Sequence, residues 1–275
     1  MVRDITLGQY YPGNSLIHRL DPRMKVVLTL AFIVFIFVAT NFQGLAFMLL
    51  LMAIVLILSG VPLSQYLKSL KAVIFIVAFT FVLNLFYGGG TTLWSWHFMH
   101  FTMQITDGGI SNAVFVATRI FSLILFSSVL TFTTSPTQLT DALERLMKPL
   151  NVLHIKVHEI AMMMTIALRY VPTLLEETDK IMNAQKARGA DLESGGFMQR
   201  IKSLIPILIP LFVSSFRRAY DLAMAMECRC YHGGEGRTKM KQLHMSGLDA
   251  AAAAAAALFC GAVVFCAVYF PPALR

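Results

Sequence analysis

Two arginines, at positions 188 and 229, have the surroundings that most clearly suggest a binding chemistry. Each lies between small residues; the two short segments consist of Ala187, Arg188, Gly189, Cys228, Arg229 and Cys230. A guanidinium presents a planar fork of N–H donors that fits a carboxylate. Two such groups with little bulk beside them could enter narrow acidic grooves on a partner. The plainer explanation is that a cation near a helix C-terminus complements the helix dipole, a contribution of about 0.3–1 kcal/mol.

Other chemistry-bearing residues do not form a catalytic or metal-binding pattern. His154 and His158 have the spacing of zinc ligands on a helix, but the sequence offers no third ligand beside them. The glycine-rich segment 233–238 lacks the lysine and the spacing of a phosphate-binding loop. We therefore predict a chain that is not an enzyme, with no catalytic residues, no metal and no cofactor bound by the chain itself.

The composition predicts a membrane protein. Hydrophobic residues make up 57% of the chain and charged residues 14%, and the mean hydropathy is +0.67. A soluble domain has about 25% charged residues. The net charge of +8 would fit nucleic acid in a soluble protein, but the sequence has no basic stripe interleaved with aromatic residues. We predict that the chain binds no nucleic acid.

Five apolar segments predict about five membrane-spanning helices, at 26–41, 44–59, about 71–87, about 110–133 and about 248–270. The stretch 26–59 would reach about 51 Å as one helix, beyond the roughly 30 Å core of a bilayer. We favour two short spans there, although one span stays open. Arg119 lies inside the fourth span, where we expect it either to pair within the bundle or to reach toward the surface.

The distribution of lysine and arginine predicts the orientation. Four precede the first span, two lie between the second and third, and fifteen lie in 134–246, whereas the predicted outer segments hold Arg275 alone. Positive charge marks the cytoplasmic side. We therefore expect a cytoplasmic N-terminus and three regions: 1–133 with the head and four spans, 134–246 as a cytoplasmic domain, and 247–275 with the last span. The outer segment 88–109, which holds Trp94 and Trp96, is expected to be a loop.

The cytoplasmic region 134–246 predicts three helices, two of them long and amphipathic. The first begins at Ser135, and the long ones end near the two arginines. Apolar residues spaced by three and four form a continuous stripe on each long helix, and Arg169, Glu177 and Lys180 lie on the opposite face of the earlier one. The stripe residues of interest are Ile160, Met163, Met164, Ala167, Leu168, Val171, Leu208, Phe212 and Phe216.

Several segments together resemble one known family. They are 185–191, 205–219, the Cys-Arg-Cys-Tyr end with 233–238, the early Leu-Asp-Pro-Arg at 20–23, and the helix start at 135–136. This pattern is similar to the transmembrane subunit of energy-coupling factor (ECF) vitamin transporters, the CbiQ/EcfT family, over nearly the whole chain. The resemblance implies an all-α, multi-pass protein of a prokaryotic cell membrane. It also implies a coupling subunit of an ATP-driven importer of a vitamin or other micronutrient.

In that family the long helices end in Ala-Arg-Gly motifs that dock in grooves on two ABC-type ATPases. Arg188 matches in full, whereas Cys228 and Cys230 flank Arg229 where alanine and glycine would complete the motif. The resemblance implies two EcfA-like ATPases, interpreted as a heterodimer, that bind ATP and Mg. It also implies a separate substrate-binding S component in the membrane, which we expect at the apolar stripe.

The alternative is a conventional ABC permease subunit that forms the substrate path itself. Such a subunit should have more polar positions in its spans than Asn84 and Arg119 provide. The sequence leaves open which vitamin or metal is carried, whether the two ATPases are identical, and how many S components share this subunit.

Overall fold

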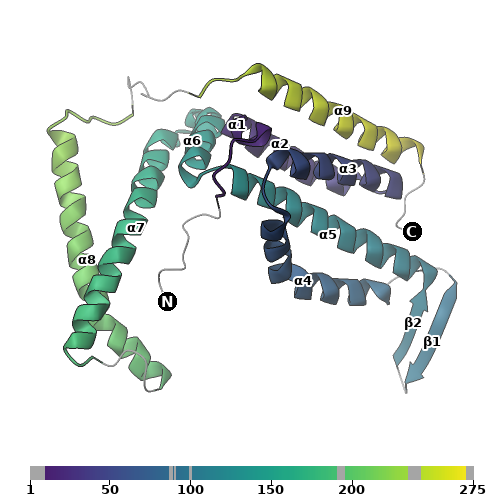
Figure 1. Ribbon diagram of the computed structural model, residues 1–275, viewed down its shortest axis with the longest axis horizontal. Helices are drawn as coiled ribbons and strands as arrows, with labels where there is room; N and C mark the ends of the chain where they lie inside the picture. The colour runs from purple at the N-terminus through teal and green to yellow at the C-terminus, as the bar shows by residue number, and fades with distance from the viewer. Residues whose placement is uncertain are drawn as a thin grey trace. The chain divides into compact units, whose positions relative to one another are not determined.

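The computed structural model describes residues 10–86, 89, 91–98, 101–190, 196–234 and 243–270. Within 92–105, and at 197 and 200, it describes the backbone alone. The chain divides into two compact units, which are treated separately below. A membrane unit comprises Gly8–Ala142 and Gln242–Arg275, and a second unit comprises Met1–Leu7 and Leu143–Lys241. Helices dominate both units (Figure 1).

The membrane unit is a bundle of long apolar helices preceded by one helical turn. Its helices are α1 (Leu16–Arg19), α2 (Pro22–Val38), α3 (Phe42–Ser59), α4 (Leu63–Leu85), α5 (Asp107–Thr133) and α9 (Gly247–Tyr269). Among the described residues, α3, α4, α5 and α9 are each long and apolar enough to cross a membrane. Helix α2 has 17 residues and a similarly apolar sequence. The prediction of an all-α membrane protein is confirmed, and α2 lies where the first of the five predicted spans was expected.

The stretch 26–59 forms two helices rather than one. Helix α2 ends at Val38, Ala39 is extended, and α3 begins at Phe42. Asn41 lies in the break, where its side-chain amide donates to the carbonyl oxygens of Cys266 (2.7 Å) and Phe270 (2.8 Å). The break therefore both turns the chain and ties it to the end of α9.

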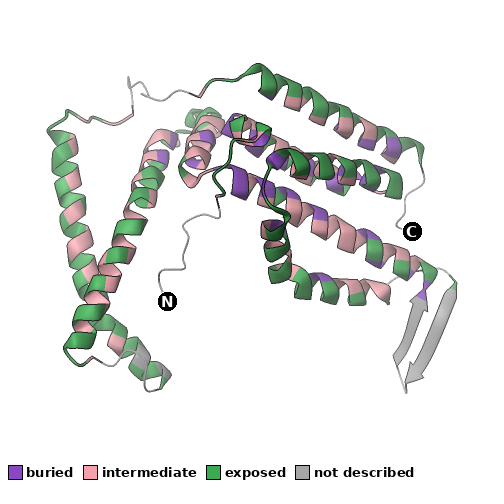
Figure 2. Ribbon diagram, in the orientation of Figure 1, coloured by how far each residue is buried: buried purple, intermediate pink, exposed green. Residues whose placement is uncertain are grey.

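The core of the membrane unit lies where α2, α3, α5 and α9 meet. Phe32 of α2 stacks on Phe126 of α5, with ring centroids 3.9 Å apart. Phe115, Met48 and Val263 belong to the same cluster and are fully buried. Outward-facing positions are apolar as well, with Phe75 80% exposed, and Figure 2 shows the helices' outer faces as exposed. Such a surface is stable only in lipid or against a partner.

Backbone carbonyls at the helix ends receive donors from neighbouring helices. Lys25, which is 5% exposed, donates from Nζ to the carbonyl oxygens of Thr133 (2.8 Å) and His18 (3.2 Å). Arg119 donates from Nη2 to the carbonyl oxygen of Ala39 (2.7 Å), and its guanidinium carbon lies 4.7 Å from the centre of the Phe115 ring. Arg119 therefore pairs inside the bundle, which is one of the two alternatives that the sequence left open.

The Leu-Asp-Pro-Arg segment joins the start of α2 to the start of α9. The Asp249 carboxylate accepts the backbone N–H groups of Asp21 (2.8 Å) and Ser246 (2.7 Å). Arg23 pairs with the Asp21 carboxylate at 2.8 Å and also donates to the carbonyl oxygen of Leu243. Both acids are buried. These charge-assisted bonds hold two chain segments together that are far apart in the sequence.

The segment between α4 and α5 is a β-hairpin, so the prediction of a loop over 88–109 was wrong. Strand β1 (Thr92–Phe98) pairs antiparallel with β2 (Phe101–Thr106). The glycines on either side suggested a loop. Between them, however, aromatic and polar residues alternate, and that period is typical of a strand with one apolar face.

Replacing Lys25 with methionine should destabilise the membrane unit. The change keeps the length of the side chain but leaves the carbonyls of Thr133 and His18 without their donor, at a cost of about 1–3 kcal/mol for each unsatisfied group. Thermal unfolding of the purified chain in detergent, followed by far-UV circular dichroism, should show a lower midpoint. Lys71→Met, on an exposed position of α4, is the control and should leave the midpoint unchanged. Equal midpoints for the two variants would contradict the anchoring role of Lys25.

Candidate partner-binding site on the two long helices

The second unit is built on two helices of equal length. Helix α7 (Val157–Ala187) and helix α8 (Phe197–Glu227) have 31 residues each. They follow α6 (Pro136–Met147) and the 3-10 helix η1 (Lys148–Leu153). Prolines at 172, 206 and 210 lie within the helices without ending them. At 1.5 Å per residue each helix is about 46 Å long.

Helices α7 and α8 cross in antiparallel directions, as Figure 1 shows, and a carboxylate holds the crossing. Glu177 of α7 pairs with Arg218 of α8 at 2.5 Å and accepts the hydroxyl of Ser214. Further along, the Gln185 side-chain amide donates to the carbonyl oxygen of Pro206 at 3.2 Å. The Glu177 and Arg218 side chains are 19% and 33% exposed. Partial burial strengthens this ion pair relative to a fully solvated one.

The sequence analysis put Glu177 on the face of α7 opposite the apolar stripe, and in the structure Glu177 contacts α8. The face opposite the apolar stripe includes the contact with α8, so part of that polar face is covered. Ile207, buried in the same unit, lies near Ser214 and Arg218 on the helical wheel. A mixed polar and apolar face of α8 therefore meets α7.

Helix α7 ends in a Schellman motif centred on Arg188. The N–H of Ala190 bonds to the carbonyl of Gln185 (3.0 Å), and the N–H of Gly189 bonds to the carbonyl of Lys186 (3.0 Å). Gly189 has φ +84, the left-handed conformation that this cap requires. Ala187, Arg188 and Gly189 are all exposed.

Helix α8 ends in the same way, with the same hydrogen bonds at the equivalent residues. The N–H of Tyr231 bonds to the carbonyl of Met226 (3.1 Å), and the N–H of Cys230 bonds to the carbonyl of Glu227 (2.8 Å). Cys230 has φ +54 and takes the place of the glycine. Cys228, Arg229 and Cys230 are exposed. Both arginines therefore immediately precede the left-handed residue of a matching cap.

The left-handed backbone at Cys230 is a feature that sequence reasoning missed. A residue with a side chain pays about 1 kcal/mol for this conformation, so glycine is the usual choice. The available signal was the match between Cys230 and Gly189 within the paired motifs. That match indicated a small residue at position 230, and it also placed Cys230 at the backbone position that Gly189 occupies in the other cap.

The predicted stripe residues are largely exposed in this chain. Fractional exposure is 38% for Ile160, 58% for Met163, 43% for Met164, 48% for Leu208, 61% for Phe212 and 70% for Phe216. Ala167 is exposed, and Leu168 and Val171 are half-buried. On α8 the three exposed residues follow each other at intervals of four, on a different face from Ser214 and Arg218. The stripe of α8 thus remains available while the other face meets α7.

The two histidines that have the spacing of zinc ligands lie in different surroundings. His158 contacts the Glu144 carboxylate at 2.9 Å, whereas His154 is exposed in the turn before α7, with φ +58. Within the described part of the chain, no three side chains of metal-binding type gather at one point.

Comparison with known proteins identifies the family. The family model described as "Cobalt transport protein" (CbiQ) matches residues 13–240. Proteins named "Energy-coupling factor transporter transmembrane protein EcfT" are similar over most of both chains. The relative from Ruminiclostridium cellulolyticum is 53% identical over 249 residues, or 90% of this chain and 92% of the relative. Those from Thermosediminibacter oceani and Bacillus subtilis are 52% and 46% identical, over 91% and 90% of this chain and 93% of each relative.

Similarity of this extent defines a class of membrane protein, the transmembrane components of energy-coupling factor transporters. The chain belongs to the CbiQ family within that class. Neither the family model nor these names assign roles to the arginines or to the stripe, which stay predictions.

Exchanging the residues at the left-handed positions should change the stability of the two caps in opposite directions. Gly189→Ala should weaken the α7 cap by about 1 kcal/mol, and Cys230→Gly should strengthen the α8 cap by a similar amount. Hydrogen exchange read by mass spectrometry should show about fivefold faster exchange at 188–190 and about fivefold slower exchange at 229–231. Gly196→Ala is the control, because Gly196 has a negative φ and open space around it. Unchanged exchange at both caps would refute the assigned conformations.

Proposed function

We propose that this chain is the coupling subunit of an ATP-driven importer of a vitamin or related micronutrient. Two partner ATPases bind the ends of α7 and α8 and hydrolyse ATP with Mg. A separate S component in the membrane binds the substrate. Motion of the ATPases passes through the two helices to that S component, and this chain carries out no catalysis.

The observation that carries the proposal is the pair of matching helix ends. Arg188 and Arg229 occupy the same position in two Schellman motifs, and both are exposed. Because α7 and α8 are antiparallel, their C-terminal ends lie on opposite sides of the crossing, at most roughly 33 Å apart by helix rise. This separation suits one ATPase subunit at each end, and the guanidinium forks suit acidic grooves.

The exposed stripe supports a second, membrane-bound partner. Met163, Phe212 and Phe216 are each more than half exposed, which is costly for apolar side chains in water. Unbranched methionine side chains also adapt to more than one partner surface. An S component that covers this stripe would be in contact with the same helices that bind the ATPases.

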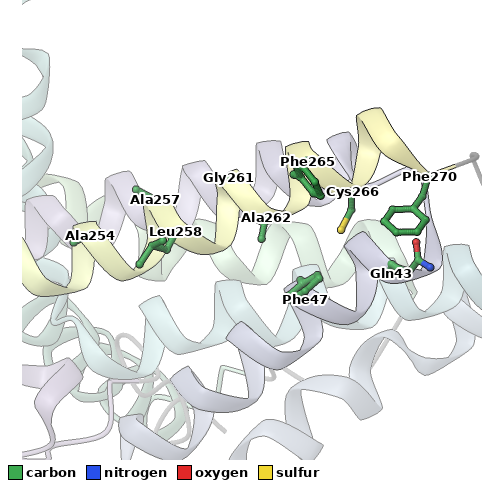
Figure 3. Close-up of a pocket in the computed structure, with 10 residues that line it drawn as sticks. All are labelled: Gln43, Phe47, Ala254, Ala257, Leu258, Gly261, Ala262, Phe265, Cys266 and Phe270. Atoms are coloured by element: carbon green, nitrogen blue, oxygen red, sulfur yellow. The ribbon is translucent and has the colours of Figure 1, made fainter.

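The mostly apolar lining of two hollows in the membrane unit supports the proposal that the substrate binds to another chain. A cavity of about 320 Å³ among α1, α2, α3, α5 and α9 is apolar apart from Lys25, Thr29 and Thr133, among the described residues that line it. All three donate hydrogen bonds to backbone carbonyls. An open groove of about 1020 Å³ between α3 and α9 has Gln43 as its polar residue beside Phe47 and other apolar groups (Figure 3). Among the described lining residues, neither hollow has more than one polar side chain that is not already bonded to a backbone carbonyl.

Reversing the charge of both arginines should abolish ATPase binding. In cells that co-express the ATPases, we expect Arg188→Glu/Arg229→Glu to reduce co-purification of the ATPases more than tenfold. A buried carboxylate in each acidic groove of the ATPases would lose its arginine partner, at a cost of about 2–5 kcal/mol. Each single variant should retain partial binding through the other end.

Arg169→Glu is the matched control for this experiment. Arg169 is exposed on α7 and remote from both caps, so its reversal makes the same charge change as each single variant without touching either end. It should leave ATPase co-purification unchanged. Full ATPase binding by the double variant would refute the docking role. Equal loss of ATPase binding in the Arg169→Glu control would show that the loss is a general effect of net charge.

Charge on the stripe should separate the two kinds of partner. Met163→Asp/Phe212→Asp should retain the ATPases but lose the S component at least tenfold in co-purification, because each buried aspartate costs several kcal/mol. Lys180→Asp, on the polar face of α7, is the control and should keep both partners. Retention of the S component would show that it binds elsewhere. Vitamin binding by this chain and the ATPases without an S component would instead support the permease alternative.

A further inference from the structure

The hairpin between α4 and α5 is amphipathic in its strand register. Its non-polar pairs are Trp94 with Ile105, Trp96 with Met103, and Phe98 with Phe101. The pairs between them are Ser95 with Gln104 and His97 with Thr102. Because residues alternate between the two faces of a sheet, six apolar residues share one face and four polar residues share the other.

The hairpin is also free of formal charge and continuous with a lipid-facing helix. Residues 86–106 contain no lysine, arginine, aspartate or glutamate. Helix α5 begins at Asp107, directly after β2, and residues 86–91 join the end of α4 at Leu85 to β1. Of the four candidate spans in the described chain, α4 has the smallest buried share, and Leu83 and Phe86 at its end are exposed. The lipid-facing surface of α4 therefore leads straight into the hairpin.

Two physical limits define where such a hairpin is stable. A two-stranded hairpin alone is marginal in water, so its apolar face requires a cover. Its outer edges, however, carry unpaired N–H and C=O groups, which exclude it from the hydrocarbon core. The boundary between headgroups and acyl chains satisfies both limits, and it is where tryptophan accumulates.

We propose that the β1–β2 hairpin lies in the interfacial layer of the bilayer, with the face that carries Trp94, Trp96 and Phe98 against lipid. It fixes the depth of α4 and α5 at the membrane end where they emerge. The occupant of this face is lipid rather than a protein subunit, because the face is neutral, aromatic and continuous with the exposed surface of α4.

The chain provides its own reporter for this proposal. It has two tryptophans, and both are in β1. The full chain is reconstituted in phosphatidylcholine vesicles that carry bromine either near the headgroup or near the end of the acyl chains. Shallow bromine should reduce tryptophan emission about twofold, deep bromine should reduce it less, and aqueous acrylamide should quench it weakly.

A matched variant moves the reporter to the other face of the same strand. In Trp94→Phe/Trp96→Phe/Ser95→Trp, the single tryptophan takes the position of Ser95, and its emission should be quenched by acrylamide and little by brominated lipid. Strong acrylamide quenching of the unaltered chain would place the hairpin in water and overturn the proposal. Stronger quenching by deep bromine would overturn the interfacial position. In the chain co-reconstituted with its membrane partners, protection from both quenchers would assign the face to a protein.

Discussion

The membrane unit depends on one constraint: the last carbonyls of a helix inside a bilayer must find donors, since no water is there to supply them. Here the donors come from other helices. Lys25 serves the end of α5, Arg119 the end of α2, and Asn41 the end of α9. Each bond fixes the axial position of one helix against another, so the bundle resists sliding. Thr133 is the last residue of α5, and the chain continues from there into α6.

In the second unit, too, a polar side chain holds two helices together. Two long helices have to hold each other while leaving their apolar stripes uncovered. Glu177 makes this possible, because one carboxylate accepts from both Arg218 and Ser214 on the face of α8 turned to α7. A crossing held mainly by apolar packing would have covered side chains such as Phe212, which stays exposed. Helix α8 therefore contacts α7 with the face that carries Ser214 and Arg218 and leaves its apolar stripe exposed.

Local patterns predicted much of this architecture. The split of 26–59 followed from helix length against bilayer thickness, and the two long helices followed from the spacing of apolar residues. Features that depend on distant residues were not predictable in this way. The Glu177–Arg218 pair forms only once the helices cross, and the partners of Lys25 come from α1 and α5. The hairpin was missed because the flanking glycines suggested a loop more strongly than the alternation of aromatic and polar residues suggested strands. The left-handed backbone of Cys230 was missed because residues with a side chain seldom adopt that conformation. The roles of Arg188 and Arg229 in docking stay predictions.

The position of the Glu177–Arg218 bond along the two helices has a mechanical consequence. As many residues separate Glu177 from Arg188 as separate Arg218 from Arg229, so each helix extends roughly 16 Å from the bond to its arginine. The bond thus lies at the midpoint between the two arginines along the helix pair. Forces that are equal and opposite at the two arginines produce rotation about this point and no net translation. Such a couple acts on the helix pair as a whole, because the Gln185–Pro206 hydrogen bond joins α7 to α8 a second time.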